Sequence, residues 1–368
     1  MTEQTNGDSY EGQQFGLHIP LDVQAALVDL PIRSYRPEDY LWLDRWMGSL
    51  AAFYDGHTPE NKPLDQLVNA EKTDSRGFFT KSKAILVSYD ETTGNPTGAL
   101  CLNHKRGGAV KIGPVVVDTA LRGRGIGKTL FEAADIYAET IGARKLFATT
   151  SHLNAVVNRL FERYGFGVEA TFPDQYKRGS QELIWGKFTP GHPSERQDSL
   201  EISVVAPYAG HIATISTYTE VDRGYIARVN EIYTEWHNDL GDDFIEGMTK
   251  GHERGLQTGL SFQEKGKIIN VAITDSGEPA GMLTYTPKRG GPVKLYPLAG
   301  SVEAQTELID RAVELARASG NHKLYTFAHV EDITQRELLA KQNFIERGTL
   351  RSPYKDGNDL VALDRMII

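Results

Sequence analysis

One glycine-rich basic segment of this sequence carries the residue types that bind phosphate. Residues 122–128 read Arg-Gly-Arg-Gly-Ile-Gly-Lys, and a helical pattern begins where they end. Glycine allows a backbone to approach a ligand closely, and the free N–H groups and positive dipole end of a helix N-terminus favour an anion. The segment therefore predicts a cradle for a phosphate or pyrophosphate group. Its members are Arg122, Gly123, Arg124, Gly125, Ile126, Gly127 and Lys128.

Two common phosphate-binding motifs do not fit this segment. A dinucleotide-binding GxGxxG turn should follow the first strand of a βαβ unit, whereas a hairpin of strands is predicted before residue 118. Residues 123–129 end in Gly-Lys-Thr, but they are one residue too short for the P-loop pattern GxxxxGK[ST]. The loop is therefore of another class.

The elements that must position this loop follow from hydrophobic periodicity. In the first half of the chain we expect strands at residues 32–35, 84–89, 97–102, 109–117, 145–149, 168–172 and 182–188. Helices are expected at residues 37–54, 64–71, 128–140 and 154–164. In the second half we expect helices at residues 221–237, 243–255, 302–318 and 334–341, and strands at residues 268–274, 281–286 and 323–327.

The second half repeats the first. Lys105-Arg106-Gly107-Gly108 recurs 183 residues later as Lys288-Arg289-Gly290-Gly291, whereas Tyr176-Lys177 recurs 178 residues later as Tyr354-Lys355. The second copy has therefore lost five residues, and the loss falls where its glycine-rich loop should be. The Lys-Arg-Gly-Gly segments are interpreted as hairpin turns, with a substrate-guiding role as the alternative.

The repeat and the local composition together define the expected domains. Residues 1–18 are polar and predict a disordered tail, and residues 189–199 have the proline, glycine and charge content of a linker. We expect one domain over residues 30–188 and a second over residues 200–368.

Composition and charge narrow the class of protein. Hydrophobic residues make up 40% and charged residues 24% of the chain, as in ordinary globular proteins. We expect a cytoplasmic protein with no membrane partner, because no uninterrupted apolar stretch could cross a bilayer. The formal net charge is −9 and neither half is strongly basic, so nucleic acid is not expected as a partner. The single cysteine, Cys101, and the spacing of the histidines predict no metal site.

Two motifs in order resemble the GNAT family of N-acetyltransferases. Arg122-x-x-Gly125-x-Gly127 is similar to the family's [QR]xxGx[GA] motif, and Asn154 followed by Tyr164-Gly165-Phe166 is similar to its later Asn…Gly-Phe segment. The resemblance covers residues 32–188. It implies an α/β (α+β) fold class: two tandem GNAT folds, each with a mixed, mostly antiparallel, splayed central sheet flanked by helices.

The resemblance also implies a cofactor and a reaction. Acetyl-CoA would bind with its pyrophosphate on the glycine-rich loop and with its pantetheine arm along the preceding strand, where one N–H polarises the thioester carbonyl. An amine would then attack the thioester directly in a ternary complex. The cofactor-binding residues outside the loop are then Val115, Val116, Val117 and Asn154.

Two proton transfers accompany such a reaction. Family members often carry a Tyr as the acid where this chain has Phe161, and Tyr164 is the substitute candidate, with core packing as its alternative role. Asp118 and His152 follow strands that should splay apart, so either could be the base, although Asp118 also suits a turn cap.

In the second half, residues 298–303 read Leu-Ala-Gly-Ser-Val-Glu and lack the basic loop. We therefore expect one cofactor site, a degenerate second domain, and no metal. The expected function is transfer of an acetyl group to the primary amine of a small polar metabolite, such as an amino sugar, an antibiotic precursor or an amino acid derivative.

The acidic balance of the second half favours a cationic acceptor, and the protein is expected to be a monomer or homodimer. The alternatives are a non-catalytic acyl-CoA-binding or regulatory protein, and a protein N-terminal or lysine acetyltransferase.

Overall fold

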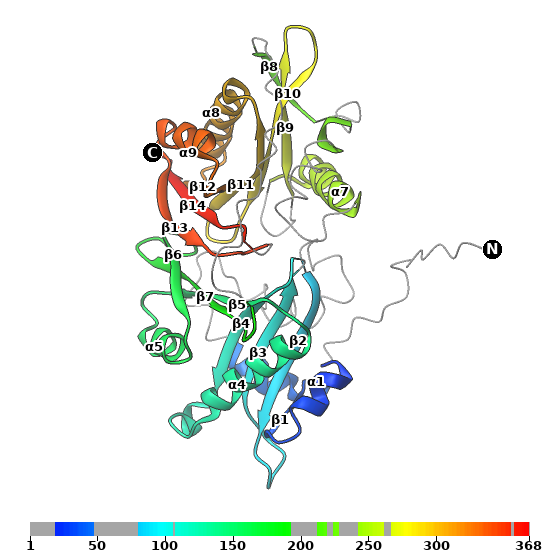
Figure 1. Ribbon diagram of the computed structural model, residues 1–368, viewed down its shortest axis with the longest axis vertical. Coiled ribbons are helices and arrows are strands. Elements are labelled where there is room, and N and C mark those ends of the chain that lie inside the picture. Colours follow the sequence, from blue (N-terminus) through cyan, green and yellow to red (C-terminus); the bar gives the residue numbers. More distant parts are fainter. Residues whose placement is uncertain are drawn as a thin grey trace, which may run out of the picture.

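The structure is a computed structural model that describes residues 19–47, 80–105, 107–192, 212–218, 224–227, 242–260, 266–354 and 357–367. Figure 1 shows two lobes stacked along the long axis of the molecule. The lower lobe contains α1 (Leu21–Ala26), β1 (Ile32–Ser34), η1 (Pro37–Asp39), α2 (Tyr40–Met47), β2 (Thr80–Tyr89), β3 (Pro96–Lys105), β4 (Ala109–Val117), η5 (Thr119–Leu121), α4 (Ile126–Thr140), β5 (Lys145–Ser151), α5 (Ala155–Arg163), β6 (Gly167–Pro173) and β7 (Gln181–Phe188). The upper lobe contains β8 (Ile212–Thr217), α7 (Asp242–Thr258), β9 (Ile268–Thr274), β10 (Pro279–Pro287), β11 (Pro292–Gly300), α8 (Val302–Ala318), β12 (Lys323–His329), α9 (Ile333–Lys341), β13 (Ile345–Leu350) and β14 (Leu360–Met366).

The described strands form one mixed sheet of 14 strands. Their order is β1-β2-β3-β4-β5-β7-β6-β13-β14-β12-β11-β10-β9-β8, so the sheet passes from one lobe into the other through β6 and β13. All neighbours are antiparallel except β4 with β5 and β11 with β12. The protein thus has the expected fold class, a large and mostly antiparallel sheet flanked by helices.

Each lobe packs helices on both faces of its part of the sheet. In the lower lobe, the main core lies between one face of the sheet and the helices α1, α4 and α5. The helix α2 covers the other face of the sheet with Leu43, Trp42 and Trp46. In the upper lobe, α8 and α9 pack on one face and α7 packs on the other (Figure 1). The two halves therefore meet at the strand ends that lie between the lobes.

The order of elements in the upper lobe is that of the lower lobe. The run β9-β10-β11-α8-β12-α9-β13-β14 follows the same sequence of strand and helix as β2-β3-β4-α4-β5-α5-β6-β7. The pairing agrees as well, because β7 lies between β5 and β6 just as β14 lies between β12 and β13.

Most predicted elements are confirmed, and three have the predicted bounds: β4, β9 and α8. Six elements have no predicted range: α1, η5, β8, β11, β13 and β14. The expected start of the first domain at residue 30 leaves out α1, although Val23 and Leu27 are buried in the main core of the lower lobe. The predicted tail at residues 1–18, the helix at 64–71 and most of the linker and of the helix at 221–237 lie outside the described residues.

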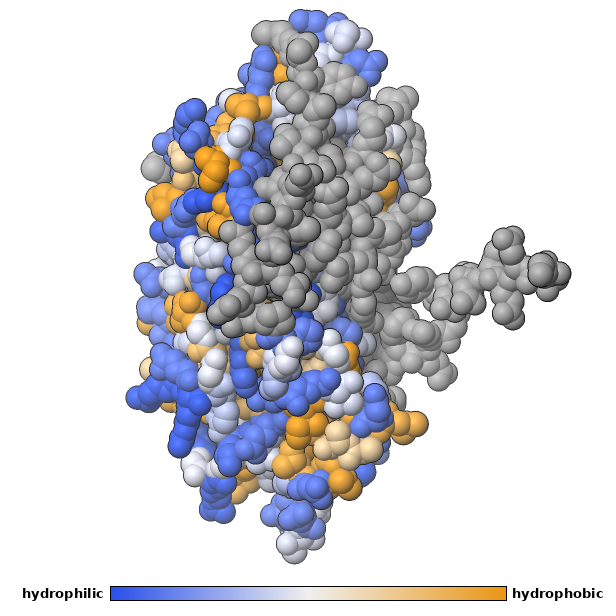
Figure 2. Space-filling view, in the orientation of Figure 1, coloured by the Kyte–Doolittle hydropathy of each residue, from blue (hydrophilic) through white to orange (hydrophobic). Residues whose placement is uncertain are grey.

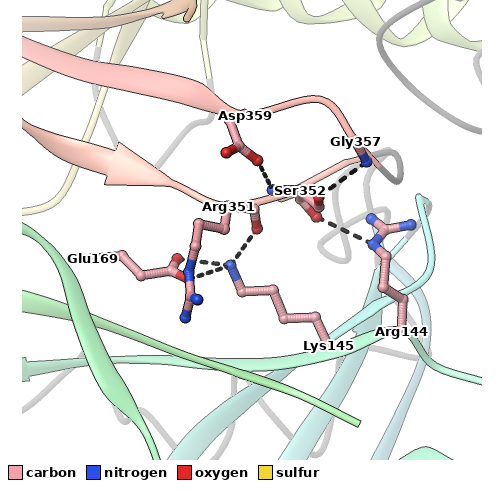
Figure 3. Close-up of polar contacts among 7 residues, drawn as sticks. All are labelled: Arg144, Lys145, Glu169, Arg351, Ser352, Gly357 and Asp359. Carbon is pink, nitrogen blue, oxygen red and sulfur yellow. Dashed lines mark hydrogen bonds and ion pairs between the residues drawn. The ribbon is translucent and has the colours of Figure 1, made fainter. Parts of the chain in front are cut away.

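Reciprocal hydrogen bonds join the lobes, and Figure 3 shows one side of them. Lys145 Nζ donates to the carbonyl of Arg351, and Arg144 Nε donates to that of Ser352 at 3.1 Å. On the other side, Lys323 Nζ donates to the carbonyl of Pro173 at 2.6 Å, and His322 Nε2 donates to that of Asp174 at 2.9 Å. The second set corresponds to the first under the 178-residue repeat.

The two buried lysines have carboxylate partners from different strands. Glu169 on β6 accepts from Lys145 Nζ at 2.8 and 2.7 Å, and Gly186 on β7 leaves the room that this carboxylate fills. In the upper lobe the repeat places Arg347 and Asp364 at the positions of Glu169 and Gly186. Asp364 forms ion pairs with Lys323 and Arg347 at 2.7 and 2.6 Å. The negative charge has thus moved from one strand to its neighbour.

The described surface on the face drawn in Figure 2 is mostly hydrophilic. A small apolar patch lies near the bottom right, where Figure 1 draws α1, and Leu21 and Val28 are exposed there. Within the described residues no helix is long and apolar enough to cross a membrane.

Candidate functional site

The glycine-rich loop joins β4 to α4 in a conformation that only glycine adopts easily. Gly123 and Gly125 have φ values of 82° and 90°, in the left-handed region where a Cβ would cause strain. A Cβ built on either residue would meet nothing within 4 Å. Gly125 is the N-cap of α4, and no side chain caps this helix end. The first N–H groups of α4 are therefore available to an anion, as the sequence predicts.

The cations of the loop surround this helix end. Arg122, Arg124 and Lys128 are exposed, and Arg122 Nε donates to the carbonyl of Val117 at 3.4 Å. Lys128 pairs with Glu132 one turn further along α4 at 3.2 Å. Ile126 and Gly127 are half-buried, and the position of Gly127 faces Leu160 of α5. The residues present therefore fit a pyrophosphate group, which needs open backbone donors and cations.

Beside the loop, β4 and β5 separate. They pair only at Ala109↔Lys145, Val110↔Leu146 and Lys111↔Phe147, so the rest of β4 has no ladder partner on that side. A register shift between Leu100 and Leu102 of β3 marks a bulge in the pairing with β4 at the start of this opening. Val115 and Val117 are half-buried, and Val116 is 9% exposed. The predicted pantetheine strand is thus accessible where the sheet splays.

Two predicted residues on α5 have well-defined local roles. Asn154 is the N-cap of the helix, and its side-chain oxygen accepts from the N–H of Val157 at 3.4 Å. Tyr164 is the C-cap, and its ring stacks on Phe131 with centroids 5.1 Å apart. Phe161, at the position of the usual family Tyr, is buried between Trp185 and Phe131. The ring of Tyr164 therefore belongs to the aromatic packing of the lower lobe.

The two base candidates lie at the ends of the splayed strands, and both make structural hydrogen bonds. Asp118 follows β4 and caps η5, because its carboxylate accepts from the N–H of Ala120 at 2.9 Å. His152 follows β5, and its Nδ1 accepts from the N–H of Gln181 at 2.8 Å. The lone pair of Nδ1 is thus already used in a hydrogen bond.

The structure adds a residue that sequence reasoning missed, Glu182 on β7. It is buried, it pairs in register with Ser151 at the end of β5, and the hydroxyl of Thr149 donates a hydrogen bond to it. Burial raises the pKa of Glu182 to about 7, against the opposing effect of Lys111 and the Thr149 hydrogen bond. A carboxylate poised near pH 7 suits a general base. In the sequence it is an isolated polar residue at a strand start, and no pattern distinguishes it.

The corresponding region of the upper lobe is closed. Only Ser301 separates β11 from α8, and its Oγ caps the helix by accepting from the N–H of Ala304 at 3.1 Å. Gln305 and Gln335 donate to the carbonyls of Gly300 and Leu298. Leu295 through Ala299 are buried, whereas the matching stretch of β4 is mostly half-buried. One N–H of this helix end is thus capped by a side chain, and the strand before it is buried.

The sequence of the lower lobe matches a known family. Residues 35–166 match the profile of the acetyltransferase (GNAT) family. The match spans the α2 helix, the splayed strands β4 and β5, the glycine-rich loop and α5. The chain therefore carries a GNAT acetyltransferase domain over these residues, and the family uses acetyl-CoA.

Solved structures that match part of this chain include several acetyltransferases. Ribosomal-protein-alanine N-acetyltransferase from Brucella melitensis is 21% identical, with 42% of this chain and 99% of that chain covered and a TM-score of 0.35. Spermidine N-acetyltransferase from Vibrio cholerae is 16% identical, with 43% and 94% covered and a TM-score of 0.35. An N-acetyltransferase from Staphylococcus aureus Mu50 is 16% identical, with 43% and 97% covered and a TM-score of 0.35. No curated protein matches the chain.

Proposed function

We propose that this protein is an acetyl-CoA-dependent N-acetyltransferase with one cofactor site, in the lower lobe, and that it acetylates the primary amine of a small polar metabolite. One observation carries the proposal. The splayed end of β4 leads into a glycine-rich loop and an uncapped helix N-terminus, whereas the same region of the upper lobe is filled by its own side chains.

Separate parts of the site would bind the pyrophosphate and the pantetheine arm of acetyl-CoA. The N–H groups of α4 and the side chains of Arg122, Arg124 and Lys128 hold the pyrophosphate by charge-assisted hydrogen bonds. The backbone of Val115 to Val117 lines the pantetheine arm, and a strand N–H there polarises the thioester carbonyl. Asn154 lies at the start of α5, shortly after β5. The amine attacks the carbonyl carbon, and coenzyme A leaves as a thiolate.

Glu182 is the base that we propose for the amine proton. An alkylammonium must lose a proton before it attacks, and the raised pKa of Glu182, about 7, matches that task. Asp118 and His152 remain the alternatives, each tied to a structural hydrogen bond. Tyr164 is the candidate for protonating the thiolate, although a thiol pKa of about 8.5 makes the thiolate a fair leaving group without help.

Calorimetric titration with acetyl-CoA, followed by a thiol-release assay over a panel of amines, tests the proposal. We expect 1:1 binding to the native protein and none to Gly125→Trp, whose side chain would fill the space above α4. Gly94→Trp is the matched control, because Gly94 also has a positive φ and lies in an exposed turn. Absence of acetyl-CoA binding to the native protein would refute the proposal. Binding without thiol release for any amine would favour a non-catalytic acyl-CoA-binding protein.

The repeat of elements supports a wider proposal about organisation. We propose that residues 30–188, extended to include α1, and residues 200–368 are two copies of one GNAT-like module, and that only the first keeps its cofactor site. We further propose a cytoplasmic enzyme that is a monomer or a homodimer.

A further inference from the structure

Lysines occupy matching positions on the sheet in both lobes. In the lower lobe, Lys83, Asn103 and Lys111 are direct partners on β2, β3 and β4. Cross-strand partners lie on the same face of a sheet, so both lysines point to the side that α2 covers. In the upper lobe Lys294 holds the position of Lys111, with its ammonium 4.5 Å from the ring centre of Tyr296.

The two hairpin turns bring these lysines together between the lobes. Gly107 in the β3–β4 turn lies against the backbone of Tyr354, since a Cβ there would be 2.5 Å from the Tyr354 carbonyl oxygen. Gly290 in the β10–β11 turn lies equally close to the backbone of Tyr176. Each hairpin of one half thus packs against the backbone of a repeated tyrosine in the other half.

Five lysines therefore converge, and we call them the lysine cluster. Its members are Lys105, Lys111, Lys267, Lys288 and Lys294, all of which keep some exposed surface. Lys288 interacts electrostatically with Lys111 of the other lobe as well as with Lys267 and Lys294 of its own. The stem of Lys267 crosses α7 at Gly251. In the part of the chain that the structure describes, Lys83, Arg254, Arg289 and Glu182 also act electrostatically on the cluster.

Burial and like charge make the charged forms of these lysines unfavourable. Burial and mutual repulsion lower the pKa of Lys105 and of Lys288 to about 7, and burial lowers that of Lys267 and Lys294 to about 8. Folded-state pKa values below the ordinary 10.5 mean that the fold loses stability as pH falls from about 10.5 to about 8 or 7, because the unfolded chain takes up protons there that the folded lysines do not. A bound anion would reverse this by favouring the protonated lysines.

We propose that the lysine cluster binds the anionic groups of the acceptor, so that the acceptor is an amine with two or more negative charges carried by carboxylate or phosphate groups. This inference rests on the proposed acetyltransferase function. It departs from the cationic acceptor that the net charge of the upper lobe favours, because the charge next to a site matters more than the sum over a half of the chain.

The position of the cluster relative to the splay supports this inference. Lys111 is the last residue of β4 that pairs with β5, so the splay opens immediately after it. Glu182 acts electrostatically on Lys111. The two side chains lie on the same face of the sheet, because their partners on β5, Ser151 and Phe147, are an even number of residues apart. An anion held by the cluster therefore leaves the amine of the same molecule close to the proposed base and to the open strand.

Binding of simple anions tests the inference without relying on activity. Inorganic phosphate and citrate are titrated into the full-length protein saturated with coenzyme A, which blocks the glycine-rich loop, in two buffers of different ionisation enthalpy at pH 7.5. We expect 1:1 binding with proton uptake, weakened about 10- to 100-fold in Lys288→Met and in Lys294→Met through loss of one charge-assisted contact. Lys341→Met, which removes an exposed lysine of α9, should bind as the native protein does.

The two anions distinguish two classes of acceptor. Binding of phosphate alone identifies a phosphorylated amine, and binding of citrate alone identifies a polycarboxylate amine. If neither anion binds, or if both lysine variants bind as the native protein does, the inference is wrong. Thermal unfolding checks that the variants fold, and we expect both to be at least as stable as the native protein because repulsion is relieved.

Acetyl-CoA titration in parallel separates this inference from the proposed function. Acetyl-CoA binding without anion binding would overturn the inference alone, whereas anion binding without acetyl-CoA binding would overturn the proposed function alone. In the thiol-release assay, phosphoethanolamine and aspartate should give a kcat/KM about tenfold or more above those of ethanolamine and spermidine. The opposite order would contradict an anionic acceptor.

Discussion

Replacing Glu169 by glutamine should destabilise the protein strongly while leaving its shape intact. The carboxylate accepts two hydrogen bonds from Lys145 and one from Arg351, and the side chains of Glu169 and Lys145 are only 3% and 2% exposed (Figure 3). Glutamine keeps the volume and removes the charge, so an ammonium group would stay buried without a counterion. Breaking a buried pair in this way costs about 3 to 5 kcal/mol.

The cost of deprotonating Lys145 gives a second value for this loss in free energy of unfolding. The variant could avoid a buried charge by deprotonating Lys145, whose pKa is already lowered by desolvation. From the ordinary lysine pKa, losing the proton at pH 7 costs about 5 kcal/mol, which bounds the penalty from above. The expected loss in free energy of unfolding is therefore about 3 to 5 kcal/mol, measured by urea denaturation.

Two matched variants make the experiment decisive. Glu132→Gln removes the partner of Lys128 in a pair whose side chains are 42% and 63% exposed, and it should cost less than about 1 kcal/mol. The double variant Lys145→Met with Glu169→Leu removes both buried charges and should recover most of the loss. If Glu169→Gln costs no more than Glu132→Gln, water reaches the pair and the reasoning fails.

Three further outcomes follow from the site and the junction. Glu182→Gln should lower kcat at pH 8 by about 100-fold or more. In the native enzyme, kcat should fall tenfold per pH unit below a midpoint near 7, because the base becomes protonated there. If the variant shows the same fall in kcat at low pH, Glu182 is not the base. Gly107→Ala and Gly290→Ala each push a methyl group into the backbone of the other lobe. Each should lower the free energy of unfolding in urea by about 2 to 4 kcal/mol. Gly94→Ala should lower it by only about 1 kcal/mol, because φ is positive there but the space is open. Gly300→Ala should destabilise the upper lobe similarly because its methyl would meet Gly281 and Ala280, yet leave acetyl-CoA affinity unchanged in calorimetry.

The elements with strong local signals were predictable from the sequence. The β-branched run of β4 and the helical stripe of α8 have the predicted bounds, because periodicity and capping act over neighbouring residues. The same holds for the glycine-rich loop, where residue types alone indicate its backbone conformation. In contrast, α1 is six residues long and is held by contacts with α4, and β8 exists through pairing with β9. Neither has a local pattern strong enough to identify it.

The remaining parts of the site depend on which segments the fold brings together. Glu182 has a raised pKa because other strands bury it beside Lys111, and no sequence window contains both. The Lys-Arg-Gly-Gly turns were predicted as turns, but their lysines converge only because each hairpin packs on the Tyr-Lys segment of the opposite half. Charge totals for each half average over such arrangements and therefore do not reveal the lysine cluster from which we infer an anionic acceptor.

The passage of one sheet through both lobes has a consequence for taking the protein apart. An exposed strand edge offers unpaired N–H and C=O groups to any other chain, and proteins avoid long free edges for this reason. Here β6 and β13 cover each other, with Gly348 facing Ala170 where the two backbones approach closely. Separating the halves would uncover two such edges at once. Each lobe therefore protects the edge strand of the other from pairing with another chain, and this role of the upper lobe does not depend on a cofactor site.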